Sequence, residues 1–229
     1  QLPDAILADA KIFHTTCFAL SKNPARTTIL SRAKKAKELA EDAGWILAAE
    51  LRAHGVDFSF APVLDMDYGE SQVIGNRAFH DKAQAIHELA YALMHGLKHG
   101  GMPAVGKHFP GHGYVVADSH VAIPVDEREF DEIAQNDMQP FRQLIDDGIQ
   151  AIMPAHVIYP KVDTRPAGFS QTWILDVLRQ KLAFTGAVFS DDLSMAGARV
   201  LDGKPISFTE VALAALKAGC DLALLCNQS

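Results

Sequence analysis

The chain has 229 residues, 48% hydrophobic and 21% charged, which is typical of a soluble globular protein that buries a full core. Its net charge of −7 argues against nucleic-acid binding, and no apolar run reaches the roughly 20 residues of a membrane span. At this length we expect one domain, spanning residues 1–229.

The three cysteines are odd in number and lack the spacing of a metal site: Cys17, Cys220 and Cys226. Cys220 and Cys226 flank an apolar segment, as small buried residues do. This usage favours a reducing compartment.

The first half of the chain predicts two helices and two strands. Residues 1–25 have mixed periodicity and are expected to form mainly loop. Apolar residues then recur at helical spacing over 27–54 and over 83–99, and glycines follow both segments as stop signals. Apolar strands are predicted over 56–64 and 102–106, the second leading directly into the histidine-rich segment 107–113.

The second half continues the alternation of helix and strand. A helix is expected over about 136–147 with Pro140 near its start, followed by a strand over 151–157. A helix over 172–182 precedes a strand over 186–192, and a capping box at 207–210 begins a helix that leads to a last strand over 222–226. Trp45 and Trp173 lie in helical patterns and are expected in the core or in helix packing.

Five strands separated by helices predict a parallel sheet, and polar residues follow every strand. No glycine-rich nucleotide-binding loop follows any of them. In an α/β (β/α)8 TIM barrel all these strand ends meet at one rim, which favours a barrel over an open sheet. The rim residues are Asp65, Asp67, Lys107, His108, His156, Asp191, Asp192 and Asn227.

The rim residues can support acid–base or nucleophilic chemistry. Asp191 is the favoured reactive carboxylate, and strand alternation turns Asp192 the other way. Asp118 lies two residues before His120 and can orient its imidazole for general acid–base work. Asp67 and Asp192 are better explained as supporting or capping carboxylates, and His112 either shapes its turn or belongs to the site.

The remaining histidines lie on predicted helices or loops, where surface or packing roles are expected. They are His14, His54, His80, His87, His95 and His99.

Five motifs occur in order and together resemble the family 3 glycoside hydrolases, with the bacterial β-N-acetylglucosaminidases of cell-wall recycling as the best match within the family. The likeness covers roughly residues 40–227. The motifs are Phe-Ala-Pro-Val-Leu-Asp at 60–65, Ile-Gly-Asn-Arg-Ala-Phe at 74–79, Gly-Lys-His-Phe-Pro-Gly-His-Gly at 106–113 with Asp-Ser-His at 118–120, Met-Pro-Ala-His at 153–156 and Phe-Ser-Asp-Asp-Leu-Ser-Met at 189–195.

The resemblance implies a cytoplasmic, cofactor-free and metal-free retaining hydrolase that removes terminal β-linked N-acetylglucosamine from peptidoglycan fragments. By position in the motifs, Asp191 matches the nucleophile, His120 the acid/base and Asp118 its partner. Arg77, Lys107 and His108 match residues that bind the sugar. Supporting roles are then expected for Asp65, His156, Asp192 and Asn227, in a protein that is expected to be a monomer without membrane or nucleic-acid partners.

One part of the family pattern is missing from these residues. The family's barrel begins with three further strands, the third ending in a Val-Asp-x-Glu-Gly-Gly-Arg type of motif that binds the sugar, and the 229 residues do not contain it. The chain is therefore expected to supply about the last five strands of the barrel, and the activity of these residues on their own is an open question.

Two rival hypotheses stay open. A metal-dependent barrel hydrolase would use His108, His112, His120, His156 and Asp191 as ligands, although Lys107 beside His108 disfavours a cation. A non-catalytic sugar-binding protein would keep the rim without turnover.

Overall fold

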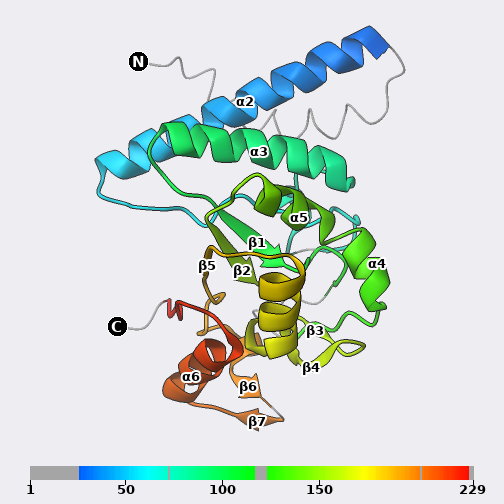
Figure 1. Cartoon of the computed structure of the whole chain (residues 1–229), viewed down its shortest axis with the longest axis vertical. Helices are drawn as coiled ribbons and strands as arrows, with labels where there is room; N and C mark the ends of the chain where they lie inside the picture. Colours follow the sequence, from blue (N-terminus) through cyan, green and yellow to red (C-terminus); the bar gives the residue numbers. More distant parts are fainter. Residues whose placement is uncertain (1–25, 72, 117–122, 202, 227–229) are drawn as a thin grey trace.

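A parallel sheet lies at the centre of the molecule with helices around it (Figure 1). The computed structural model describes residues 26–71, 73–116, 123–201 and 203–226, with side chains from residue 34 onward. Three strands form the sheet in the order β1 (Val105–Phe109), β2 (Ala151–Pro154) and β5 (Ala187–Val188), all parallel. Their buried, largely apolar residues place the core on this sheet.

Two further segments continue the sheet at its edges. Parallel bridges join Ser59 to Ala104 and Val63 to Lys107 beside β1, and Phe189 to Leu222 beyond β5. The five predicted strand positions are therefore confirmed, and they lie side by side in chain order. Sequential parallel order is that of a (β/α)8 barrel, whereas a doubly wound sheet reverses direction part-way.

The two helices predicted from helical spacing are confirmed as α2 (Arg26–Ala53) and α3 (Ala83–His99), and they pack side by side on the outer layer (Figure 1). Glycines set how closely they approach. A Cβ at Gly96 would collide with the backbone oxygen of Glu41, and one at Gly44 would collide with that of Leu93. The two helix backbones are thus in direct contact.

The predicted helix over about 136–147 is confirmed as α5 (Gln139–Asp146), and a shorter helix that was not predicted, α4 (Phe130–Gln135), precedes it. Pro140 explains the break between them, because it has no N–H to bond the carbonyl four residues earlier and is tolerated only in a first turn. It occupies that place in α5.

The predicted helix after residue 171 is confirmed in place but is a π-helix, η4 (Thr172–Lys181), and it ends with a bond from Leu182 N to Val177 O. Trp173 is fully buried in it, whereas Trp45 on α2 is 48% exposed, so of the two predicted places, core or helix packing, the core is wrong for Trp45. The smaller elements are η2 (Gly75–Arg77), β3 (Ile158–Tyr159), β4 (Asp163–Pro166), η3 (Ala167–Phe169), η5 (Ala196–Ala198), β6 (Val200–Leu201) and β7 (Lys204–Pro205).

The last helix, α6 (Phe208–Ala218), has the predicted capping box. Ser207 Oγ accepts from Glu210 N, and the Glu210 carboxylate accepts from Ser207 N at 2.8 Å. Gly219 ends the helix at φ 116°, a conformation that glycine adopts without strain.

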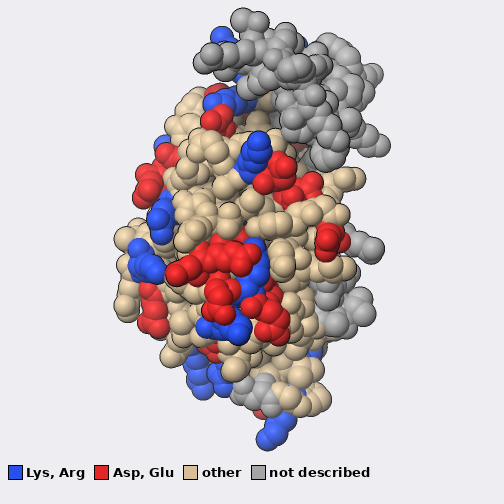
Figure 2. Space-filling view, turned by 90° about the vertical axis from the view of Figure 1, so that its right-hand side faces the viewer, with Lys and Arg blue, Asp and Glu red and all other residues tan. Residues whose placement is uncertain are grey.

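Surface charge is mixed rather than segregated on the face that Figure 2 shows, where acidic side chains gather near the middle and basic side chains lie among them. Such a face offers no continuous basic stripe. Within the described residues, no helix combines the length and apolarity needed to cross a membrane.

The glycine contact between α2 and α3 makes Gly96→Ala a test of the packing. A methyl group at a helical glycine ordinarily stabilises by about 1 kcal/mol through helix propensity. Here the methyl group meets the Glu41 backbone, so we expect the variant to be less stable by about 1–3 kcal/mol. Urea unfolding measures the change. Ala43→Gly, on the exposed face of α2, is the control and should lose about 1 kcal/mol from propensity alone; a stabilised Gly96→Ala variant would contradict the contact.

Candidate active site

The carboxyl ends of the parallel strands bring the predicted rim residues together. Asp65 follows the first strand segment, Lys107 and His108 lie in β1, His156 follows β2, and Asp191 follows β5. Each of them interacts with at least one of the others by a hydrogen bond or through its charge. The convergence expected of a barrel rim is therefore present.

Asp65 connects the first strand segment to the end of β1 and to the turn that follows it. The fully buried carboxylate accepts from His108 Nδ1 at 2.7 Å, from His108 N at 3.2 Å and from His112 N at 2.7 Å. Since an ionised carboxylate only accepts, His108 carries its proton on Nδ1 and its Nε2 is the ring nitrogen not held by Asp65. Asp65 thus fixes the orientation of the His108 ring.

The pKa of Asp65 shows which influence dominates. Burial opposes its ionisation, but the charge and hydrogen bond of His108, with contributions from His112, lower its pKa below the ordinary value. Asp65 is therefore ionised at neutral pH.

Asp191 lies three residues beyond β5, in the middle of the rim's charges. Burial opposes its ionisation, but His156, His108, the Asp192 N–H and Lys107 lower the pKa below its ordinary value. Its hydrogen bond within the described chain comes from Asp192 N to Oδ1 at 2.7 Å. An ionised carboxylate with so few partners retains the lone pairs that a nucleophile needs.

Asp192 has a different role from its neighbour. Its carboxylate accepts from Ser194 N at 2.9 Å, from Ser194 Oγ at 2.7 Å and from Cys226 N at 3.0 Å. It therefore fixes the turn after β5 to the last strand segment, as expected for a capping carboxylate. Asp67 similarly accepts from Gly69 N at 2.9 Å in its own turn.

His156 is completely buried and stacks on Phe169, with ring centroids 5.3 Å apart and planes 7° from parallel. Its Nε2 donates to the Asp192 carbonyl at 3.2 Å, which leaves Nδ1 as an acceptor that finds no protein partner within the described residues. Burial lowers the pKa of His156, with Asp191 opposing the shift. His156 is therefore a neutral imidazole at the rim.

Lys107 and Arg77 supply cationic donors to the same region. Burial lowers the pKa of the Lys107 ammonium; Asp191 opposes this shift, and the charge of Arg77 adds to it. Arg77, in η2, is exposed and is oriented by bonds from Nε and Nη2 to the Val73 carbonyl at 2.9 and 2.7 Å. The predicted sugar-binding cations therefore lie close enough to influence each other.

His112 is buried beside His108, with ring centroids 5.8 Å apart. Burial, together with the charge of His108, lowers its pKa. The neighbouring Gly113 packs directly on the Met66 backbone, where any side chain would collide. His112 is thus fixed by its turn and lies beside the rim residue His108.

A buried charged network was not found by sequence reasoning. Arg128 binds both oxygens of Asp126, donates Nη1 to Asp137 Oδ2 at 2.9 Å and to Tyr68 OH at 3.1 Å, and lies 3.9 Å over the Tyr114 ring. Burial and the charge of Asp137 raise the pKa of Tyr68 to about 12, so it remains a donor. The network joins the segments before and after residues 117–122.

Three predicted site residues cannot be placed. Asp118, His120 and Asn227 lie outside the described residues.

The histidines away from the rim have local partners, as predicted. His54 bonds the Glu50 carbonyl, His87 bonds Asp147, and His95 and His99 both contact Glu41. His14 lies outside the described residues. Among the residues described, the rim does not bring three possible metal-ligand atoms within 4.8 Å of one another, whereas Glu41, His95 and His99 do.

Residues 19–229 match the glycosyl hydrolase family 3 N terminal domain. The chain belongs to glycosyl hydrolase family 3. A beta-hexosaminidase of Methylobacillus flagellatus is 75% identical over 195 residues, covering 85% of this chain and 55% of that protein. A beta-hexosaminidase of Thiobacillus denitrificans is 60% identical over 194 residues, covering 85% and 53%.

Solved structures of the family agree with the fold. NagZ from Neisseria gonorrhoeae in complex with N-trifluoroacetyl-D-glucosamine superposes with a TM-score of 0.80 at 45% identity, over 94% of this chain and 58% of that one. A family 3 beta-N-acetylglucosaminidase from Paenibacillus superposes with a TM-score of 0.78 at 36% identity, covering 82% of this chain and 36% of that one. The predicted family and its (β/α)8 barrel type are confirmed, and the chain spans about half the length of the curated relatives it matches.

The bonds of Asp65 predict a pH-dependent loss of stability in Asp65→Asn. Removing the charge should lower the free energy of unfolding by about 2–3 kcal/mol at neutral pH, as for hydrogen bonds to charged groups. The folded-state pKa lies below the ordinary 3.8, so this contribution is complete above about pH 4 and is lost as pH falls through the lower folded value.

Chemical denaturation between pH 3 and pH 7 tests this expectation. Asp42→Asn, an exposed site on α2, is the matched control and should change stability little at any pH. A deficit in Asp65→Asn that does not shrink below pH 4 would show that the charge of Asp65 is not its source.

Proposed function

We propose that the protein containing this chain is a retaining β-N-acetylglucosaminidase that removes terminal β-linked N-acetylglucosamine from peptidoglycan fragments. The observation that carries the proposal is Asp191, an ionised carboxylate whose hydrogen bond among the described residues comes from Asp192 N and which experiences the charges of Lys107 and His108 at the barrel rim. The relatives named beta-hexosaminidase and the NagZ complex with a glucosamine derivative support this substrate class.

In the proposed reaction Asp191 attacks the anomeric carbon and the glycosidic C–O bond breaks. The leaving oxygen takes a proton from His120, giving a covalent glycosyl-enzyme. His120 then removes a proton from water, the water oxygen attacks the same carbon, and the bond to Asp191 breaks. Two displacements at one carbon retain its configuration, and both side chains return to their starting states.

The state of the other rim carboxylates supports a histidine as the acid/base. Retaining enzymes ordinarily use two carboxyl groups about 5 Å apart. Here Asp65 is occupied by His108 and His112, and Asp192 by Ser194 and Cys226, so neither is available for proton transfer. We assign that role to His120, with Asp118 as its orienting partner.

The remaining rim residues divide into sugar binding and support. Arg77, Lys107 and His108 offer donors to sugar hydroxyls, which orients the anomeric carbon toward Asp191. Asp65, His156 and Asp192 hold those groups in place, and Asn227 is assigned a similar supporting role. The mechanism needs no cofactor, and we propose that the enzyme acts as a monomer in the cytoplasm.

Asp191→Asn tests the nucleophile. An amide cannot form the ester-linked intermediate, so turnover of a chromogenic β-N-acetylglucosaminide by the full-length protein should fall by about 10⁴-fold while the sugar still binds. Asp57→Asn, an exposed carboxylate near Arg52, is the control and should leave turnover unchanged. Near-normal turnover in Asp191→Asn would remove this residue from the mechanism.

His120→Ala tests the acid/base assignment separately. Losing the proton donor and acceptor should slow turnover by about 10²–10⁴-fold. With an activated leaving group, added azide should restore the second step and yield a glycosyl azide, because azide needs no general base. An unchanged rate without azide would exclude His120. Activity lost with EDTA and restored by zinc would instead favour the metal-dependent rival.

A further inference from the structure

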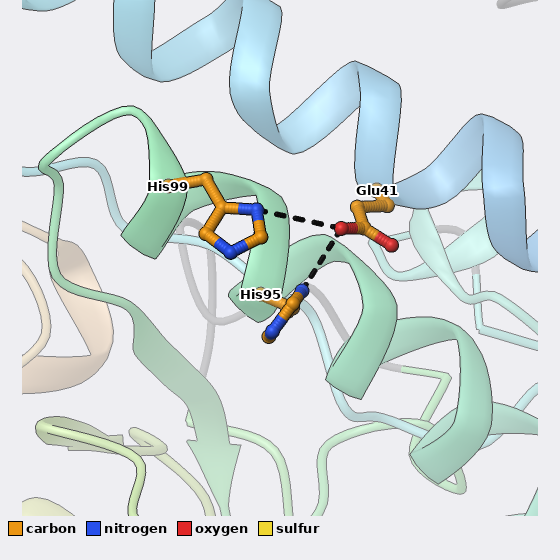
Figure 3. Close-up of side chains that lie close together, drawn as sticks. All are labelled: Glu41, His95 and His99. Carbon is orange, nitrogen blue, oxygen red and sulfur yellow. Dashed lines mark hydrogen bonds and ion pairs between the residues drawn. The ribbon is translucent and has the colours of Figure 1, made fainter.

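Three metal-ligand side chains meet on the outer layer, away from the barrel rim. Glu41 comes from α2, and His95 and His99 stand one turn apart on α3 (Figure 3). Glu41 Oε1 lies 2.9 Å from His95 Nδ1 and 3.5 Å from His99 Nδ1, so both imidazoles face the same carboxylate oxygen. The two rings lie 4.1 Å apart between centroids.

These separations match those within a tetrahedral metal site. Zinc binds imidazole nitrogen and carboxylate oxygen at about 2.0–2.2 Å, which places neighbouring ligands of a tetrahedron about 3.3 Å apart. The observed 2.9 and 3.5 Å lie on either side of that value. One ligand atom from each residue lies within 4.8 Å of the other two, so an ion can enter with small side-chain adjustments.

The backbone beneath the cluster is held firmly. Gly96, next to His95, brings α3 into contact with the Glu41 backbone, and a Cβ there would collide with it. The Tyr91 ring lies 6.1 Å from His95 and nearly parallel to it, at 20°. The ligands are therefore largely positioned before any ion arrives, which reduces the entropy lost on binding.

The cluster is open to solvent and has little competition for its carboxylate. The side chains of Glu41, His95 and His99 are 41%, 42% and 56% exposed. Among the described residues, Glu41 forms ion pairs only with these two histidines and with no lysine or arginine. Water can therefore reach the fourth ligand position.

We propose that Glu41, His95 and His99 bind a divalent transition-metal ion of the zinc class, with water completing the coordination. The donor set, two imidazoles and one carboxylate, is one that zinc accepts. Because the ligands come from two helices, the ion links α2 to α3 and stabilises their packing. The site is independent of hydrolysis, since all three residues lie on helices outside the rim.

Zinc binding by the full chain tests the site. Competition against a chromogenic chelator at pH 7.5 should reveal an ion whose affinity falls about tenfold or more in His95→Ala and in Glu41→Gln. Zinc should also raise the midpoint of thermal unfolding of the wild type but not of His95→Ala/His99→Ala. The control is His87→Ala, on the same helix but bonded to Asp147, which should bind zinc as the wild type does.

Trp45 gives a second, local measurement. It stands one turn after Glu41 on α2 and is exposed, whereas Trp173 is buried. Cu²⁺ should quench its fluorescence saturably, zinc should reverse the quenching, and Trp45→Phe should lose the signal while still binding zinc. Unchanged zinc affinity in His95→Ala/His99→Ala, or affinity lost instead in Asp191→Asn, would overturn the proposal and place the ion elsewhere.

Discussion

The buried Asp65 carboxylate is the constraint on which the rest of the rim depends. It accepts three hydrogen bonds, two from His108 in β1 and one from His112 N just after β1, and so joins two neighbouring strand ends. The ionised state persists despite complete burial because those partners outweigh desolvation. Through it, the position of His108 and the local charge that acts on Asp191 are both set.

Side chains of the same type at the rim differ in their hydrogen-bond partners. Asp65, Asp191 and Asp192 all follow strands, yet within the described part of the chain Asp191 has fewer hydrogen bonds than the other two. The two histidines His108 and His156 differ in the same way. His108 is bonded to the Asp65 carboxylate, whereas His156 is bonded to the Asp192 carbonyl and stacks on Phe169. A position in the sequence assigns a residue to the rim, but its bonding determines what it can do there.

The sequence predicted the strands and the polar residues at their ends, but it did not predict interactions between residues far apart in the chain. Apolar runs that end in polar residues located all five strands and Asp65, Lys107, His108, His156 and Asp191, because chain order and parallel pairing place strand ends together. Arg128 left no such pattern, since its partners Asp126, Asp137 and Tyr68 are spread over nearly 70 positions and do not follow the ends of predicted strands.

The same limit applies to the outer layer. His95 and His99 are surface residues as predicted, but their shared contact with Glu41, 54 positions before His95, was not predicted because it depends on the packing of α2 against α3. Trp45 was expected in the core or in helix packing, and its side chain is 48% exposed.

The Arg128 network also has a consequence for how the family can vary. Arg128 is bonded to Asp126 and Asp137, and all three side chains are buried. Removing one partner of a buried ion pair leaves the other charge unpaired, which typically costs about 3–5 kcal/mol. Arg128 and its two carboxylates are therefore expected to change together, rather than one at a time, as the sequence diverges.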